Sequence, residues 1–192
     1  MTKETRPEVK AIQTAYDADH VATVVQLAEP WLKREPTNLS VTCWYVESLF
    51  RMTHYDKAAS VLDSALKSFE NPGAQHFLYL IYGQLERYRG QYLESEKWYE
   101  EAIRTRPNEA TAYIFLGAAL AKQGKLVDAE RVLRDAIQCH DGAIDEAYCN
   151  LGLVLRGQGK FNESVDALQS ALALDPDYED ANNALKDVEK CV

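Results

Sequence analysis

Apolar and small residues recur along this chain with a period of about 34 residues. Within each period, large apolar side chains fall three or four positions apart, which is the spacing of one helix face. Gly83, Gly117 and Gly152 stand at the same point of three successive segments, at intervals of 34 and 35 residues. A period of this length predicts a stack of small helical units instead of a globular core built around one active site.

Each segment reads as two helices joined by a short turn. Glycine occurs between the two helices, where it can end a helix in the left-handed conformation. These turn glycines are Gly90, Gly124 and Gly159. On the second helix, a small residue is expected to fill the narrow gap opposite the first-helix glycine. The small residues are Ser95, Ala129 and Ser164.

Less regular copies precede and follow these three segments. Residues 39–72 keep the apolar pattern, but Val46 replaces the first-helix glycine and Thr53 replaces the turn glycine. Residues 5–38 keep less of the pattern, and Pro30 falls inside their expected second helix, so we interpret them as a degenerate terminal repeat. Residues 179–192 carry an apolar stripe at helical spacing and are expected to cover the end of the stack.

With these residues in register, the chain resembles the tetratricopeptide repeat (TPR) family, whose unit is a 34-residue helix–turn–helix. The resemblance implies an all-α fold, a right-handed α-solenoid with a C-terminal capping helix, in a single domain spanning residues 1–192. The repeats are expected at 5–38, 39–72, 76–109, 110–144 and 145–178, with the cap at 179–192. Extra residues at 71–73 and near Gly142 are expected to lengthen loops without breaking the stack.

Composition narrows the possible partners. The formal net charge is −9 and the isoelectric point is about 5.0. Nucleic-acid binding depends on neutralising phosphates with basic residues, and anionic membranes attract basic segments, so both are poor candidates. No stretch is apolar enough to insert directly into a membrane. The N-terminal residues lack the apolar core of a signal peptide, which favours a cytoplasmic protein.

The residue types that carry catalysis are scattered. The four cysteines form no C-x-x-C pair and the four histidines have no ligand spacing, so no metal or other cofactor is expected. The segment 157–160 (Gly-Gln-Gly-Lys) lacks the spacing of a phosphate-binding loop. It occupies the same repeat position as 122–125, so we interpret both as turns between helices. These observations argue against an enzyme.

The resemblance also implies which residues line the concave groove, because the first helix of each repeat faces inward in this family. The candidate protein-binding residues are Trp44, Phe50, Arg51, Phe77, Leu80, Ile81, Gln84, Arg87, Tyr88, Ile114, Phe115, Lys122, Asn150 and Arg156. The apolar members predict a hydrophobic trough, and the four cations lie at one edge, where acidic groups of a partner would pair. The alternative is that the apolar members pack between neighbouring first helices or under a terminal segment.

Chaperone-binding members of the family resemble each other in a clamp for a C-terminal carboxylate. The clamp needs lysine and asparagine on one repeat, asparagine on the next, and lysine and arginine on the third. Asn150 is the only asparagine at the required position, and no set of repeats supplies both cations. The sequence therefore predicts no tight binding of a free C-terminal carboxylate of the heat-shock chaperone type.

Three functional hypotheses follow. The first is a protein–protein interaction module, acting as an adaptor, scaffold or subunit chaperone, that binds an apolar peptide or helix of a partner in its groove. The second is a structural subunit that self-assembles into a homo-oligomer through its terminal repeats or capping helix. The third is an enzyme or ligand-binding protein, supported only by a pocket that the aromatic residues would form.

Overall fold

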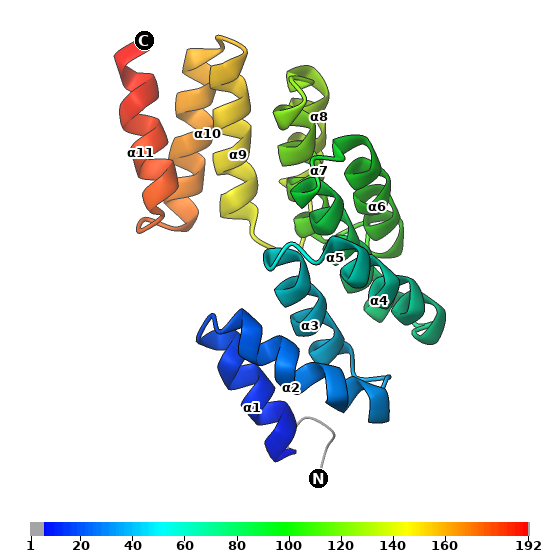
Figure 1. Cartoon of the computed structure of the whole chain (residues 1–192). Helices are drawn as coiled ribbons and strands as arrows, with labels where there is room; N and C mark the ends of the chain where they lie inside the picture. The colour runs from blue at the N-terminus through cyan, green and yellow to red at the C-terminus, as the bar shows by residue number, and fades with distance from the viewer. Residues whose placement is uncertain (1–5, 192) are drawn as a thin grey trace. The chain divides into compact units, whose positions relative to one another are not determined.

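The computed structural model describes residues 6–191 and is helical throughout (Figure 1). Eleven α-helices and no strand occur within these residues, which confirms the predicted all-α class. Two helices lie in each segment expected to form one repeat. Most of the N-terminal segment that lacks a signal core, residues 1–5, lies outside the described residues, as does Val192. The single-domain organisation and the right-handed sense of the stack stay predictions.

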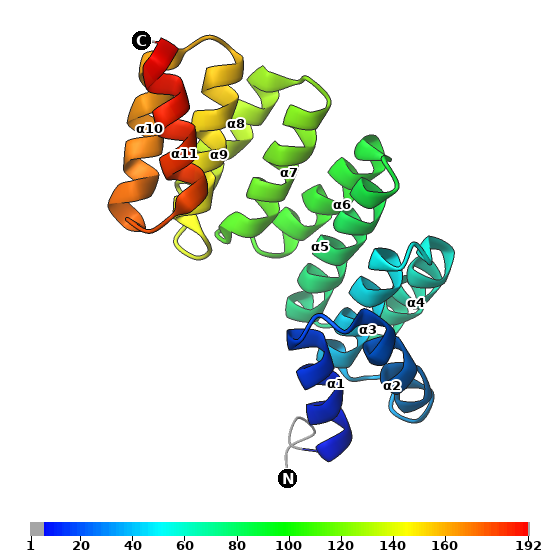
Figure 2. The same cartoon turned by 60° about the vertical axis from the view of Figure 1, so that its left-hand side comes forward.

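The first of two compact units spans Met1–Gln91. It contains α1 (Pro7–Asp17), α2 (Val21–Arg34), α3 (Leu39–Arg51), α4 (Tyr55–Ser68) and α5 (Pro72–Tyr88). Each helix packs against the next, and α3 also contacts both α1 and α5. The first helices α1, α3 and α5 therefore form one row, in which α2 packs against α1 and α3, and α4 packs against α3 and α5 (Figure 2).

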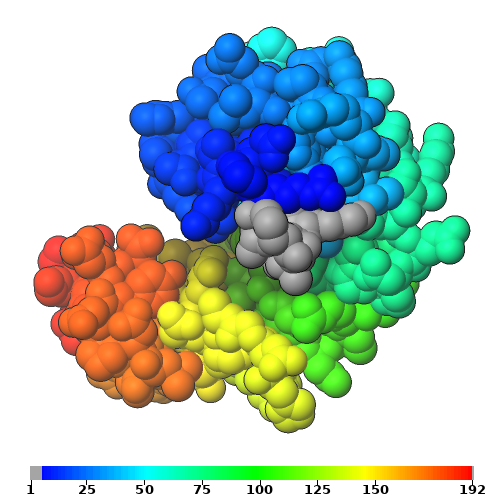
Figure 3. Space-filling view, turned by 90° about the horizontal axis from the view of Figure 1, so that it is seen from below, coloured from blue at the N-terminus to red at the C-terminus, as the bar shows by residue number. Residues whose placement is uncertain are grey.

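The second unit spans Tyr92–Val192. It contains α6 (Tyr92–Thr105), α7 (Ala110–Lys122), α8 (Leu126–Ala136), α9 (Ile144–Gly157), α10 (Phe161–Leu174) and α11 (Glu179–Val188), followed by the 3-10 helix η2 (Glu189–Cys191). Here α7 contacts α9, and α9 contacts α11. The atoms of α9 to α11, yellow to red, lie next to one another in Figure 3. The expected cap is thus α11, which ends at Val188 instead of continuing to residue 192.

The turn between paired helices has one geometry in both units. Gly90, Gly124 and Gly159 each have φ of 76°, in the left-handed region that glycine adopts at no steric cost. The equivalent turns of the first two hairpins place Asp19 at φ 61° and Thr53 at φ 63°. Thr53 therefore holds the left-handed conformation at the position where the sequence pattern expects glycine.

The first-helix glycines make room mainly for leucine, which corrects part of the sequence prediction. A Cβ atom on Gly117 would lie 2.7 Å from Cγ of Leu133, and one on Gly152 would lie 2.6 Å from Cγ of Leu168. The small residue predicted opposite Gly152 does contribute, because Ser164 Oγ donates a 2.7 Å hydrogen bond to the Gly152 carbonyl. The close approach of the helices is nevertheless set by the buried leucine one turn further along.

Of the two insertions predicted to lengthen loops, at residues 71–73 and near Gly142, only the second lies in a loop. The prediction that residues 71–73 lengthen a loop is wrong, because they begin α5. The Asn71 side chain accepts a 2.7 Å hydrogen bond from the Ala74 amide, and Pro72 occupies the first helical turn, where its missing N–H costs nothing. Near Gly142, with φ of 101°, the extra residue does lie in a loop, which is fixed by a hydrogen bond from the Ala110 amide to the Asp141 carbonyl.

Candidate protein-binding surface

The predicted groove residues all lie on first helices, but they divide between the two units. In unit 1, α3 carries Trp44, Phe50 and Arg51, and α5 carries Phe77, Leu80, Ile81, Gln84, Arg87 and Tyr88. In unit 2, α7 carries Ile114, Phe115 and Lys122, and α9 carries Asn150 and Arg156. Within each unit the helices that carry them are in contact. The structure therefore gives two local surfaces, each of which is described by itself.

Burial separates the apolar candidates into core and surface. The core members are Phe50 (3 % exposed), Leu80 (7 %), Ile81 (5 %) and Ile114 (1 %). Ile114 packs with Ala110, Ala136 and Ala147, as the alternative interpretation of packing between helices proposes. Phe77 and Tyr88 are the exposed members, at 47 % and 52 %. The side chains available to a partner are thus fewer and more aromatic than the full set.

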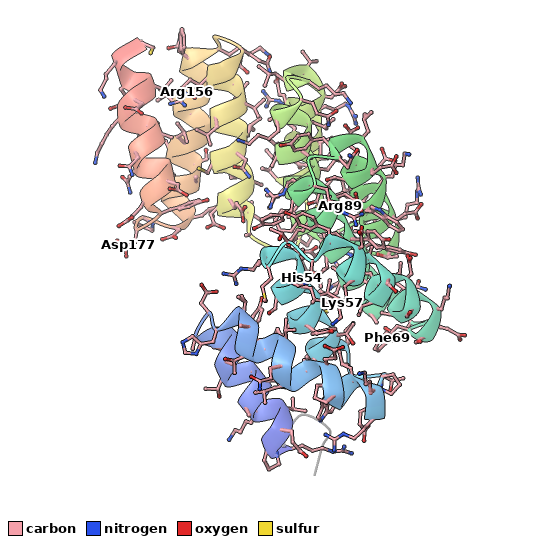
Figure 4. The ribbon with its side chains drawn as sticks, in the orientation of Figure 1. His54, Lys57, Phe69, Arg89, Arg156 and Asp177 are labelled. Atoms are coloured by element: carbon pink, nitrogen blue, oxygen red, sulfur yellow. The ribbon has the colours of Figure 1, made fainter. Side chains whose placement is uncertain are left out.

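The polar and remaining aromatic candidates lie at intermediate depth or at the surface. Arg51 at the end of α3 and Lys122 at the end of α7 are both exposed. The half-buried members are Trp44, Gln84, Arg87, Phe115, Asn150 and Arg156. In unit 2, the Phe115 ring lies 5.7 Å from that of Tyr99. Arg156, which is labelled in Figure 4, lies 4.0 Å from the Asp187 carboxylate on α11. Lys122 forms no ion pair with the described residues.

On α5, an exposed aromatic ring lies beside an arginine that has few partners. The rings of Phe50 and Tyr88 have centroids 5.0 Å apart, so Tyr88 rests on the core side chain of α3. The Arg87 guanidinium lies 5.8 Å from the Tyr88 ring centroid. Its Nε is enclosed without a hydrogen-bond partner among residues 6–191. A donor of this kind is costly to leave unsatisfied, and a carboxylate is its strongest acceptor.

Between α1 and α3, the structure forms a contact that the candidate set missed. The Tyr16 hydroxyl donates a hydrogen bond to Glu47 Oε2, and the Tyr16 and Trp44 rings lie 5.8 Å apart. Arg51, one turn beyond Glu47, pairs with Asp19 instead. Burial raises the pKa of Glu47, although Tyr16 and Arg51 act in the opposite direction. Both Tyr16 and Glu47 fall at inward positions of the repeat, so the register alone could have identified them.

The cysteine beside this contact is chemically inert. Burial, followed by the Glu47 charge, raises the pKa of Cys43 to about 12. Because the thiolate is the nucleophilic and metal-binding form, Cys43 stays a neutral thiol near neutral pH. No group of three His, Cys, Asp or Glu side chains within residues 6–191 is arranged to hold a metal ion. In the same range, no helix has the length and apolar character required to cross a membrane.

Along the turns, basic residues reach back to the second helix of the preceding hairpin. Lys160 Nζ and Gln158 Nε2 lie 2.7 and 2.8 Å from Glu130 Oε2, and the Lys160 bond is the largest cause of a Glu130 pKa lowered to about 2. Lys125 and Gln123 bind Glu96 in the same way. We call these contacts of Lys160 and Gln158 with Glu130, and of Lys125 and Gln123 with Glu96, the turn-edge ladder. They account for the Gln-Gly-Lys segments that resembled a phosphate loop. In unit 1, successive hairpins are also joined by ion pairs, but at other positions: Lys57 on α4 pairs with Glu29 on α2, and Arg89 pairs with Asp56 on α4, with Lys57 and Arg89 labelled in Figure 4.

Repeated antiparallel hairpins, left-handed turns at a 34-residue spacing and close helix contacts at glycine define a tetratricopeptide repeat protein, a class of protein–protein interaction module. Within that class the family can be stated. Residues 32–189 match the family described as "T7SS, ESX-1 secretion system protein EccA1, N-terminal domain", and the chain belongs to this family.

Curated relatives share the repeat over part of their length. Human tetratricopeptide repeat protein 7A is 30 % identical over 153 residues, which cover 75 % of this chain and 17 % of that protein. Human tetratricopeptide repeat protein 7B is 34 % identical over 104 residues, covering 54 % of this chain and 12 % of that protein. The chain therefore matches less than a fifth of the length of either relative.

Solved structures show the same fold at low sequence identity. TTC0263, a thermophilic TPR protein of Thermus thermophilus, aligns over 95 % of this chain and 97 % of its own, with a TM-score of 0.70 and 18 % identity. YrrB, described as a TPR protein with an unusual peptide-binding site, aligns over 94 % and 91 % with a TM-score of 0.61 and 16 % identity. The second TPR domain of human RPAP3, solved with the HSP70 peptide SGPTIEEVD, aligns over 62 % and 98 % with a TM-score of 0.57 and 22 % identity.

Proposed function

We propose that this chain binds a segment of a partner protein on the surface formed by its first helices. The observation that carries the proposal is the two exposed aromatic side chains of α5, Phe77 and Tyr88, with Arg87, whose Nε is unsatisfied, beside Tyr88. Large exposed apolar side chains gathered on one face are typical of interaction sites, and aromatic and arginine side chains are common anchors at interfaces.

The chemistry of this surface indicates what the segment carries. Phe77 and Tyr88 lie about three turns apart along α5, so separate apolar side chains of a helix or extended peptide would cover the two rings and remove them from water. A carboxylate on the same segment would accept from Arg87, whose stacked guanidinium is already held in place by Tyr88. On the separate surface of unit 2, Lys122 offers a further cation to an acidic group. The expected partner is therefore an apolar segment flanked by acidic residues.

The family suggests the setting in which such binding would be used. Its description names a component of a secretion system, and a chain of this class would serve there as an adaptor, scaffold or subunit chaperone in the cytoplasm. The absence of a complete carboxylate clamp in the sequence argues against recognition of a chaperone C-terminus. The segment would then be internal to the partner, or held by its side chains.

Self-assembly through the C-terminal end has less support. The outward side of α11 is polar, with Glu179, Asp180, Lys186 and Asp187 all exposed. A polar, largely acidic end surface offers little apolar area to a second copy and carries charges that repel their like. These observations favour binding through the first helices over end-to-end assembly.

The experiment is affinity capture with the full chain, comparing wild type with the Phe77→Glu/Tyr88→Glu double variant. Both side chains are exposed, so the variant should keep its helical circular dichroism, whereas a charge at the buried Ile81 would disrupt the core. A matched control is Leu93→Glu, which places the same charge at an exposed apolar position on the second helix α6. Capture that is lost in the double variant and kept in the control supports the proposal; equal capture by all three contradicts it.

A further inference from the structure

The contact between α1 and α3 in unit 1 combines two aromatic rings with a carboxylate. Tyr16 and Trp44 lie with ring centroids 5.8 Å apart, inclined by 32°. The Tyr16 hydroxyl donates to only one oxygen of Glu47, Oε2. The other oxygen can still accept hydrogen bonds, because an ionised carboxylate has about four acceptor positions.

Glu47 makes no direct ion pair within residues 6–191, although Arg51 attracts it at longer range. Arg51 is one helical turn away, but its guanidinium pairs with Asp19 at the left-handed turn between α1 and α2. Glu47 itself is half-buried, and its neighbours are the two rings and the Cys43 thiol, which is also uncharged near neutral pH. A half-buried carboxylate with no cation in direct contact carries a desolvation cost. A binding function would account for its presence.

We propose that Tyr16, Trp44 and Glu47 form a subsite for a lysine or arginine side chain of the bound partner segment. Cations are attracted both to the faces of aromatic rings and to a desolvated carboxylate, so these three side chains all favour a cation at this place. The inference rests on the proposed function and adds to it. The segment would carry a basic residue for this subsite in addition to the apolar and acidic residues for α5.

The negative charge of Glu47 determines which kind of ligand the subsite would bind. The chain as a whole is acidic, and at this point the acidic group lies among rings on the face where a partner is expected, instead of pairing along the turn edge as Glu96 and Glu130 do. A solely structural Tyr16–Glu47 hydrogen bond would need no basic ligand. Substitution of the two hydrogen-bond partners separates these possibilities.

The test begins with a displayed library of random 12-residue peptides selected against the full chain. Lysine or arginine is expected to be enriched at one position of the selected peptides. A selected peptide should then bind the Glu47→Gln variant about tenfold more weakly, since glutamine keeps an oxygen for Tyr16 but removes the charge. Replacing the peptide's basic residue by norleucine should weaken binding to wild type and leave binding to Glu47→Gln unchanged.

Two further variants supply controls. Glu70→Gln removes an exposed carboxylate from the α4–α5 loop of the same unit and should leave affinity unchanged. Tyr16→Phe keeps both rings and the carboxylate, so it should lower the melting temperature while retaining peptide affinity within about threefold. If Tyr16→Phe and Glu47→Gln lower the melting temperature alike and neither changes affinity, the contact is structural and the inference is overturned.

The remaining outcomes distinguish the two proposals. Selected peptides that lack a basic residue but lose binding to Phe77→Glu/Tyr88→Glu would overturn the cation subsite and leave the proposed function intact. A library that yields no binder to the folded wild-type chain would overturn both. Should Glu47→Gln fail to fold, as judged by circular dichroism, Trp44→Leu provides the second test, with the same expected loss of affinity for the basic peptide.

Discussion

Single residues in this chain carry backbone strain as well as chemistry, and Thr53 is the clearest case. Its φ of 63° lies in the region where a β-branched side chain crowds its own backbone. The three glycines at equivalent turns adopt the same conformation without that cost. Thr53 is exposed and lies outside the candidate surface, so its substitution tests the backbone alone.

We expect Thr53→Gly to raise the free energy of unfolding by about 1 kcal/mol, because it removes a left-handed non-glycine residue. The measurement is urea unfolding followed by circular dichroism. The reciprocal change, Gly124→Thr, meets no atom within 4 Å but has the same positive φ, and it should lower stability by a similar amount. Equal stability of Thr53→Gly and wild type would show that Thr53 adopts the left-handed conformation without backbone strain.

At the scale of the helix pair, glycine and leucine determine how closely two helices approach. Gly152 on α9 lies directly against Leu168 on α10, and Leu168 is fully buried. An added methyl group would have to displace the leucine or separate the helices. Overpacking of this kind costs about 1–3 kcal/mol.

Gly152→Ala is therefore expected to lower the free energy of unfolding by about 2 kcal/mol. Gly157→Ala on the same helix is the matched control, because its new Cβ would lie 3.3 Å from a flexible Leu126 methyl group. There, the better helix propensity of alanine should maintain or increase stability. A Gly152→Ala variant as stable as the control would show that α9 and α10 adjust freely to one another.

The turn-edge ladder acts at the same scale and makes stability depend on pH. The Glu130 pKa of about 2 lies below the value of an unperturbed glutamate. The stabilisation is therefore complete above the unfolded-state pKa, near 4.5, and is lost as the pH falls towards 2.

Glu130→Gln should thus lower the free energy of unfolding by about 1 kcal/mol at pH 7, a value that allows for solvent around Lys160 and Arg134. The difference from wild type should decrease steadily between about pH 4.5 and about pH 2.5. Parallel urea titrations at these pH values measure it. A difference that stays constant with pH would mean that the carboxylate charge does not contribute.

How far the sequence predicts this structure depends on the range of the interaction. The positions of the helix pairs, the turns and the cap α11 can be predicted from local periodicity, which places even Thr53 at the correct turn position. Contacts between successive first helices are harder to predict. Phe50 and Ile114 look like groove residues by register but pack into the core, and Asn71 caps α5 where the sequence predicts a loop. The repeat register places Tyr16 and Glu47 at inward positions, but their hydrogen bond joins residues 31 positions apart, and no local pattern pairs them.

For the whole molecule, the question is which partner an acidic interaction module selects. The net charge of −9 repels acidic ligands at a distance, whereas Arg87 and Lys122 attract them at short range. A segment with charges of both signs avoids this conflict, since Glu47 and Arg87 are both satisfied. Partner choice would then depend on the order of charges along the segment more than on its net charge.

This selectivity predicts a negative result. The peptide SGPTIEEVD, which is bound by the RPAP3 domain of similar fold, should show no binding to this chain by calorimetry at micromolar concentration. The positions that would hold its terminal carboxylate carry Cys43, Glu47, Leu80 and Gln84, none of which is a cation. Micromolar affinity would require a carboxylate site other than the clamp of the family.

The turn-edge ladder also bears on how such a chain can change in length. The hairpin formed by α7 and α8 supplies Lys125 to the hairpin before it and Glu130 to the hairpin after it. A tandem duplicate of this hairpin would therefore bring both halves of the pairing with it. Genes encoding such arrays could gain or lose a whole unit while every junction kept its ion pair, so the number of repeats could evolve separately from the stability of each joint.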